Sequence, residues 1–221
     1  MTSDRPRTFV GLTGASGHLY AETLVKELVR AGRGVDISIT DAGCKVLRHE
    51  LGVEPGTYGE RLGAALPGWL GDEIAQHVRC YRSDEVEAPP SSGTALVGGV
   101  VLCPCSMGTT SRVSVGFSSN LVERAADVAL KERRRLILVP RETPLSTIHL
   151  ENMLRLSRLG AIILPAMPGM YHKPRTMQDL IDHVVGKVLD ALEIRHAVGA
   201  RWKGLERPQE ESLVRPRDES E

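Results

Sequence analysis

The chain has 221 residues, with 28 Lys and Arg balanced by 28 Asp and Glu, so its formal net charge is zero at pH 7. This balance excludes the strongly basic footprint of a nucleic-acid-binding protein, and no apolar run is long enough to span a membrane. The length suits one sizeable α/β domain, and the sequence contains no internal repeat.

The cysteines and the first residues indicate a reducing compartment. The N-terminal segment MTSDRPRT has no apolar signal core, which favours a cytoplasmic protein. The four cysteines are Cys44, Cys80, Cys103 and Cys105, and none belongs to a Cys-x-x-Cys pair. We interpret Cys103 and Cys105 as small buried hydrophobic residues, and we expect neither a disulfide framework nor a metal site.

Strand and helix signals alternate along the chain. The apolar residues Ala21, Leu24, Val25 and Leu28 have the i, i+3, i+4, i+7 spacing of a helix. Residues 53–96, rich in Gly and Pro, are the least regular part, and only a short strand at 78–81 is predicted there. In chain order, the other predicted elements are strand 9–13, helix 18–31, strand 35–39, helix 41–51, strand 99–103, helix 119–132, strand 136–139, helix 146–158, strand 161–164 and helix 177–193.

Strands that alternate with helices of this length predict a parallel sheet with helices on both faces. We therefore expect an α/β fold with a single doubly wound, mostly parallel sheet of about six strands, Rossmann-like or flavodoxin-like. From His196 onward the composition becomes charged and poorly patterned. This change predicts a domain over residues 1–195 and a charged, partly flexible C-terminal extension over 196–221.

The first predicted strand runs into a glycine-rich turn, Thr13-Gly14-Ala15-Ser16-Gly17, and a helix follows. Glycines let a phosphate approach the backbone, and the helix N-terminus offers N–H groups and the positive end of its dipole. The turn matches neither the G-x-G-x-x-G dinucleotide fingerprint nor a P-loop. It suits phosphate binding, and equally a tight turn in which Ser16 caps the helix.

A second turn of this kind follows the strand over 99–103. Within six residues it contains four hydroxyls and a glycine, Ser106, Gly108, Thr109, Thr110 and Ser111. Such a turn can offer backbone and hydroxyl donors to a phosphate or to a flavin edge, and an ordinary hydroxyl-rich cap is the alternative. Two such turns in one doubly wound sheet favour a mononucleotide ligand.

The strand over 136–139 is followed closely by an Arg-Glu pair, Arg141 and Glu142. Ionised groups near a core must be paired or take part in chemistry. Ligands of open α/β sheets bind beyond the carboxyl ends of the strands. Arg141 and Glu142 are therefore predicted to lie where an anionic ligand is held.

Six segments in one order carry a more specific signal: GASG, PCSMGT, ERAADVALKERR, RETP, HLENM and PAMPGMYHKP. Together they resemble the flavin prenyltransferase family (UbiX type) over roughly residues 7–194. Related flavoprotein decarboxylases share the fold and part of the early pattern. The RETP and Tyr-His-x-Pro segments fit the prenyltransferases better.

The resemblance implies a transferase that binds FMN without a covalent bond. It would join the dimethylallyl group of dimethylallyl monophosphate to N5 and C6 of reduced FMN, and prenylated FMN would then serve a UbiD-type decarboxylase. The resemblance also implies a homo-oligomer, a dodecamer. Metal-dependent prenyltransferases that use diphosphates carry aspartate-rich ligands, and because the chain has no D-D-x-x-D run we expect a metal-independent reaction.

The resemblance also assigns residues by position. The implied FMN contacts are Gly14, Ala15, Ser16, Thr40, Ser106, Met107, Gly108, Thr109 and Arg141. The implied substrate contacts are Tyr171, Lys187, Lys131 and Arg141, and the implied catalytic residues are Glu142, Lys131, Ser16 and Glu50. Thr40 stands where the family commonly has Ser, Lys187 where some members have Arg, and His18 where a small residue is usual.

These residue types suit the chemistry. Ionisation of an allylic phosphate leaves a phosphate dianion, which Lys131, Arg141, Lys187 and the Tyr171 hydroxyl would stabilise. Glu142 would either pass a proton to the departing phosphate or pair with Arg141, and both roles stay open. Two other functions also stay open: a non-catalytic FMN-binding accessory subunit of a decarboxylase, and an FMN-dependent peptide or cysteine decarboxylase.

Overall fold

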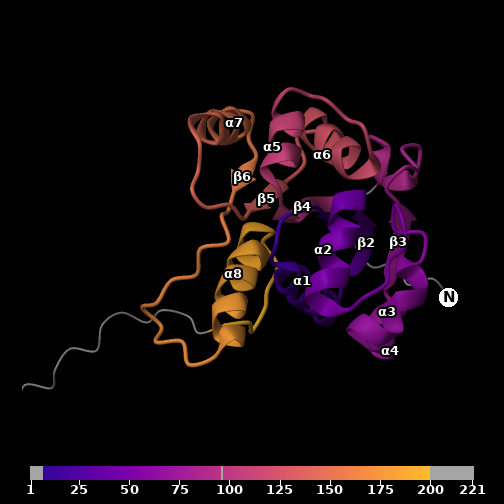
Figure 1. The fold of residues 1–221 in the computed structure, drawn as a ribbon, viewed down its shortest axis with the longest axis vertical. Coiled ribbons are helices and arrows are strands. Elements are labelled where there is room, and N and C mark those ends of the chain that lie inside the picture. The colour runs from indigo at the N-terminus through magenta and orange to yellow at the C-terminus, as the bar shows by residue number, and fades with distance from the viewer. Residues whose placement is uncertain (1–6, 96, 200–221) are drawn as a thin grey trace, which may run out of the picture.

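The computed structural model describes residues 7–95 and 97–199 (Figure 1). Its centre is a six-stranded sheet with the order β3-β2-β1-β4-β5-β6. Every neighbouring pair of strands is parallel, so the predicted doubly wound sheet is confirmed. The strands are β1 Arg7–Leu12, β2 Gly34–Ile39, β3 Val78–Arg82, β4 Val97–Cys105, β5 Leu136–Pro140 and β6 Ile162–Ile163.

The strand order reverses between β1 and β4, because the chain builds outward to β3 on one side and to β6 on the other. In open α/β sheets, ligands bind beyond the carboxyl ends of the strands at such a switch point. The two turns singled out in the sequence follow β1 and β4, the strands that flank it. The topology therefore brings turns about 90 residues apart in the chain to one edge of the sheet.

Helices cover both faces of the sheet, as predicted (Figure 1). The helices are α1 His18–Arg30, α2 Asp41–Leu51, α3 Leu62–Leu70, α4 Asp72–Ala75, α5 Met107–Ser114, α6 Leu121–Lys131, α7 Thr147–Arg158 and α8 Met177–Ala191, with a 3₁₀ turn η1 at Pro89–Ser91. The core on one face includes residues of α1, α2, α3 and α8, and the core on the other face includes residues of α5, α6 and α7.

Strand β5 shows how the sheet separates the two cores. Ile137 and Val139 belong to the core under α1 and α8, whereas Leu136 and Leu138 belong to the core under α6 and α7. Successive side chains of a strand point to opposite faces, so a continuous apolar run is needed where both faces are covered. All four side chains are fully buried, and each contributes about 1.5–3 kcal/mol to folding.

The sequence did not predict α3, α4 and α5. Helix α3 lies in the segment read as irregular because it contains Pro67 and two glycines, which oppose helix formation. It forms nonetheless, since Leu62, Leu66, Trp69 and Leu70 bury an apolar face. Tertiary packing therefore outweighs local propensity in this segment.

No helix in residues 7–95 and 97–199 has the length and apolar character needed to cross a bilayer. The four cysteines are all unpaired thiols, and Cys103 and Cys105 are fully buried, as expected from the sequence. Burial raises the pKa of both thiols, so both remain protonated at neutral pH. The predicted C-terminal extension lies outside the described residues from position 200 onward.

Candidate active site

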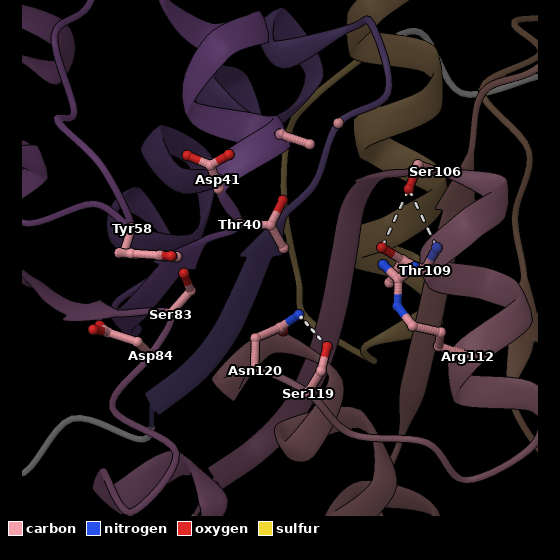
Figure 2. A pocket seen from close by; sticks show the side chains of 12 residues that line it. Thr40, Asp41, Tyr58, Ser83, Asp84, Ser106, Thr109, Arg112, Ser119 and Asn120 are labelled. Atoms are coloured by element: carbon pink, nitrogen blue, oxygen red, sulfur yellow. Dashed lines mark hydrogen bonds between the residues drawn. The ribbon is translucent and has the colours of Figure 1, made fainter.

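A cavity of about 280 Å³ opens at the carboxyl edge of the sheet, where β1, β2, β3 and β4 end (Figure 2). It is lined by Gly14, Thr40, Asp41, Ala42, Tyr58, Ser83, Asp84, Ser106, Thr109, Arg112, Ser119 and Asn120. Four predicted FMN contacts, Gly14, Thr40, Ser106 and Thr109, therefore share one cavity. Ala15, Met107 and Gly108 belong to the same two turns without lining it.

The two turns are joined by the fully buried side chain of Thr13. Its hydroxyl donates to the carbonyl oxygen of Pro104 at 2.8 Å and accepts from the backbone N–H of Ser106 at 2.8 Å. A buried hydroxyl that both donates and accepts is fully engaged. Thr13 therefore fixes the glycine-rich turn relative to the hydroxyl-rich turn.

Two helix N-termini converge on the cavity. The Thr40 hydroxyl caps α2 by accepting from the N–H of Gly43 at 3.1 Å. The Ser106 hydroxyl caps α5 by accepting from the N–H of Thr109 at 3.3 Å (Figure 2). Both capping residues have extended backbones, as helix caps require. The positive ends of two helix dipoles thus face the same space, which favours a bound anion.

Arg112 lines the cavity and is held by a buried carboxylate. Glu123, which is fully buried, accepts from the Arg112 Nε at 2.5 Å and from the backbone N–H and the hydroxyl of Ser119, each at 2.8 Å. Burial alone would raise the pKa of Glu123, but hydrogen bonds from Ser119 and Arg112 lower it on balance. An ionised Glu123 therefore aims a guanidinium at the cavity.

Sequence reasoning missed both members of this ion pair. The signal that could have found it is the position of Glu123 on the apolar face of α6, between the buried Val122 and Ala125. A carboxylate at such a position must have partners. The sequence does not reveal the partner, because Arg112 lies in α5, which was not predicted to be a helix.

Two carboxylates also line the cavity, and each has its own cation. Lys45 Nζ lies 2.8 Å from Asp41, and Arg82 Nη2 lies 2.6 Å from Asp84. These local pairs offset the negative charge at that side of the cavity. The guanidinium of Arg112 and the helix ends are therefore the groups that favour an anionic ligand.

The glycine-rich turn is organised by Glu50. Its carboxylate accepts from the N–H of Gly17 at 3.0 Å and from the N–H of His18 at 2.9 Å. Burial would raise the pKa of Glu50, but hydrogen bonds from the Ser16 hydroxyl and these two N–H groups lower it. On the other side of the turn, Arg141 Nε donates to the carbonyl oxygen of Ser16 at 3.3 Å. The structure thus brings Ser16, Glu50 and Arg141 together.

The fully buried His18 supports the same turn from below. Its Nε2 lies 3.2 Å from the carbonyl oxygen of Thr13. Burial lowers the pKa of His18, so the ring is neutral at pH 7 and its Nε2–H donates to that carbonyl. This hydrogen bond gives a structural account of the histidine that replaces a small residue in the motif.

Glu142 and Lys131 lie at opposite ends of β5. Glu142 follows its carboxyl end and accepts from the N–H of Thr143 at 3.0 Å. Lys131 ends α6, before the strand begins, and pairs with Glu132 at 2.9 Å. Five residues of strand separate them by about 15 Å, beyond the reach of a lysine side chain. One chain therefore does not bring Lys131 to Arg141 and Glu142.

Tyr171 and Lys187 belong to a second group of side chains near α8. The hydroxyl of Tyr171 lies 2.9 Å from Nε2 of His183, and Lys187 follows His183 by one helical turn. The ring of His172 stacks on that of His183 at a centroid distance of 5.0 Å. His183 was not predicted. Within residues 7–95 and 97–199, no cluster of three or more potential metal ligands occurs.

The parallel doubly wound sheet, with two helix ends and an oriented arginine around one cavity, defines a mononucleotide-binding α/β protein. Residues 2–201 match the Flavoprotein family model, so the chain belongs to the flavoproteins. A curated relative from Halalkalibacterium halodurans, flavin prenyltransferase UbiX, is 50% identical over 193 residues, which cover 87% of this chain and 91% of the relative. The chain therefore belongs to the flavin prenyltransferase (UbiX) family, and the predicted resemblance is confirmed.

Solved structures give the same result. The crystal structure of AnUbiX (PadA1) in complex with FMN and dimethylallyl pyrophosphate has a TM-score of 0.80 and 36% identity, covering 91% of this chain and 100% of that one. A dodecameric FMN-dependent UbiX-like decarboxylase from Escherichia coli O157:H7 has a TM-score of 0.76 and 36% identity, covering 90% of this chain and 100% of that one. At 36% identity, each of these two proteins resembles this chain in sequence as well as in fold.

Proposed function

We propose that the protein joins the dimethylallyl group of dimethylallyl monophosphate to N5 and C6 of reduced FMN. The observation that carries this proposal is the cavity at the switch point, where Gly14, Thr40, Ser106, Thr109 and Arg112 present donors and positive potential to one anion. Membership of the flavin prenyltransferase family selects the flavin mononucleotide among the ligands that such a cavity fits. The product, prenylated FMN, would be used by a UbiD-type decarboxylase.

The residues around the cavity fit FMN. A Cβ atom on Gly14 would lie 2.7 Å from Cβ of Ala42, so only glycine allows the backbone to pass this closely and leave the cavity open. We propose that Thr40, Ser106, Thr109 and Arg112 hold the phosphate. Ala15, Ser16, Met107, Gly108 and Arg141 would then lie along the flavin and its ribityl chain.

When bound, reduced FMN supplies the electron-rich nitrogen and carbon that accept the prenyl group. The protein's own residues bind the second substrate and move protons. Arg141, Lys187, Lys131 and the Tyr171 hydroxyl would hold the phosphate and stabilise it as the C–O bond breaks and the electron pair leaves with oxygen. Glu142 would donate a proton to that departing phosphate. The alternative pairing of Glu142 with Arg141 has less support, since Arg141 Nε bonds to Ser16 and Glu142 to Thr143.

Ser16 and Glu50 would handle a different proton. A new carbon–carbon bond at C6 displaces the hydrogen that this ring carbon carries, so the site needs a proton acceptor. The Glu50 carboxylate has a lowered pKa and is hydrogen-bonded to the Ser16 hydroxyl. It is therefore ionised at pH 7 and can take up a proton through that hydroxyl.

We propose that the site is shared between subunits of a homo-oligomer. Lys131 lies at the far end of β5 from Arg141, so a Lys131 that contacts the substrate would have to come from another copy. The E. coli relative is dodecameric, and we propose the same assembly. Light scattering at micromolar concentration should give a mass of about twelve times the 24.1 kDa chain. A monomer mass under these conditions would contradict a shared site.

The reaction is expected to need no divalent metal, because cationic side chains take the place that aspartates and a metal occupy in diphosphate-dependent enzymes. The test is anaerobic incubation of the protein with reduced FMN and dimethylallyl monophosphate in excess EDTA, followed by mass spectrometry of the flavin. We expect the mass of FMN plus one prenyl group. Loss of product in EDTA and its return with magnesium would refute the metal-free reaction.

The same assay, together with a decarboxylation assay on peptide and cysteine substrates, separates the remaining alternatives. A chain that binds FMN tightly but never forms the adduct would be an accessory subunit, and release of carbon dioxide from a peptide or cysteine substrate would indicate a decarboxylase. The leaving-group cations favour the transferase, since a carrier needs no anion site beyond the FMN phosphate.

We also propose a cytoplasmic location, supported by four unpaired thiols, and a functional domain over residues 1–195.

A further inference from the structure

A compact group of side chains surrounds Tyr171. The Tyr171 hydroxyl lies 2.9 Å from Nε2 of His183, and the backbone N–H of Gly169 donates to Nδ1 of the same ring at 3.2 Å. The tyrosine ring crosses the His183 ring edge-on, with centroids 5.5 Å apart. A Cβ on Gly169 would lie 2.7 Å from the Tyr171 ring, so only glycine permits this packing.

These contacts fix the tautomer of His183. A backbone N–H can only donate, so Nδ1 must carry a lone pair rather than a hydrogen. In a neutral imidazole the single hydrogen then resides on Nε2. Nε2–H donates to the oxygen of Tyr171, and the hydrogen of the Tyr171 hydroxyl is not the one shared with His183. That hydrogen is therefore turned away from the Nε2 atom of His183.

We propose that His183 is a positioning residue that turns the Tyr171 hydroxyl into a dedicated donor for the substrate's phosphate oxygen. This inference rests on the proposed function, which assigns Tyr171 to the phosphate. It deepens that function, because it explains how a hydroxyl that could equally accept or donate is committed to donation. An anionic phosphate oxygen is the acceptor that such a polarised hydroxyl favours.

The charges around His183 keep the ring neutral. The titratable groups that face it are Tyr171 and His172 from the loop before α8, and Lys187 from α8 itself. Burial, then the charges of His172 and Lys187, lower its pKa below the ordinary value of 6.5. At pH 7 the ring therefore has the neutral form that the geometry requires. Protonation at acidic pH would place a hydrogen on Nδ1, facing the N–H of Gly169.

The first test reads the tautomer without any ligand. Solid-state NMR of the assembled, ¹⁵N-histidine-labelled protein at pH 7.5 separates protonated from unprotonated ring nitrogens, and the spectrum of His183→Gln identifies the signals of His183. We expect an unprotonated Nδ1 and a protonated Nε2. The opposite tautomer, or a cationic ring, would overturn the inference, whatever the enzyme proves to catalyse.

The second test measures binding of dimethylallyl monophosphate by calorimetry to the protein loaded with oxidised FMN, which does not turn over. His183→Leu and Tyr171→Phe should each weaken binding about tenfold, and the double variant should be no weaker than Tyr171→Phe alone. His183→Gln, whose amide N–H can replace Nε2–H, should restore most of the affinity. The proposal would be contradicted if His183→Leu reduced the affinity for dimethylallyl monophosphate equally in the wild type and in the Tyr171→Phe variant.

The pH dependence of binding provides a matched control. The affinity of the wild type should depart from that of His183→Gln only below pH 6.5, once His183 takes up a proton, since only the wild type titrates at this position. Ionisation of the substrate and of all other groups is common to both proteins and cancels in the comparison. A departure that begins above pH 7, where the ring must be neutral, would overturn the proposal. Absence of binding by the wild type would instead refute the substrate assignment, and the NMR result would still decide the tautomer.

Discussion

The Glu142→Gln variant is expected to bind FMN normally and to form prenylated FMN about 30- to 1,000-fold more slowly than the wild type. Glutamine keeps the shape and the hydrogen bond from the Thr143 N–H, but it cannot donate a carboxyl proton to the departing phosphate. Loss of one such contact costs on the order of 2–4 kcal/mol of transition-state stabilisation. Single-turnover anaerobic assays with reduced FMN, read by flavin mass, would measure this rate.

Two companion variants sharpen this result. Lys131→Ala should show the same pattern, with FMN retained and prenylation slowed, because it removes a cation from the leaving group. Arg141→Ala should also weaken flavin binding, since Arg141 supports the turn through the carbonyl oxygen of Ser16. Glu151→Gln, an exposed change on α7, is the control for the loss of a carboxylate. A wild-type rate in Glu142→Gln would remove this residue from the chemistry.

Replacing Arg112 with Leu is expected to weaken FMN binding about 10- to 100-fold and to leave riboflavin binding unchanged. The reason is that Arg112 would contact the phosphate, the group that riboflavin lacks. Glu123→Gln should weaken FMN binding in the same selective manner, because the guanidinium loses the buried carboxylate that orients it. Titrations followed by quenching of flavin fluorescence would give both affinities.

The free energy of unfolding of each variant must be measured together with its flavin affinities, because Glu123 also accepts hydrogen bonds from the backbone N–H and the hydroxyl of Ser119. Glu123→Gln is therefore expected to lower the free energy of unfolding, and so is Arg112→Leu, because it leaves the buried Glu123 carboxylate without its cation. Arg155→Leu on α7 is the control for loss of an arginine outside the cavity. Equal losses of FMN and riboflavin affinity in Arg112→Leu would show that the arginine supports the cavity as a whole rather than the phosphate.

The fold could be predicted from the sequence because its strands are continuous apolar runs between amphipathic helices, a pattern that a covered parallel sheet imposes. The boundaries were less accurate at β4, which extends through Cys103-Pro104-Cys105, and at β6, where only Ile162 and Ile163 pair with β5. Helix α5 was missed since its apolar face is small and its hydroxyls also suit a loop.

The candidate cavity was predictable where turns after strands line it and not where side chains from different elements meet in it. Gly14, Ser106 and Thr109 line the cavity, and their turns could be recognised because small and hydroxyl residues after a strand are a local signal. Arg112 and His183 are oriented by partners that are distant in the sequence, Glu123 in another helix and Gly169 in a loop. Only the packing of α5 against α6 and of the loop against α8 reveals them.

Thr13 has a consequence for how the cofactor is acquired. The hydroxyl and the backbone N–H of Thr13 both bond to the second turn, so the relative placement of the two turns exists before any ligand arrives, and little conformational entropy is lost on binding. A valine of similar shape would leave the N–H of Ser106 without its acceptor and would remove one of the two hydrogen bonds to the carbonyl of Pro104. The two turns would then be held less firmly in the free protein. Ligand binding would have to order them, so a preorganised site would become one that forms only when the ligand binds.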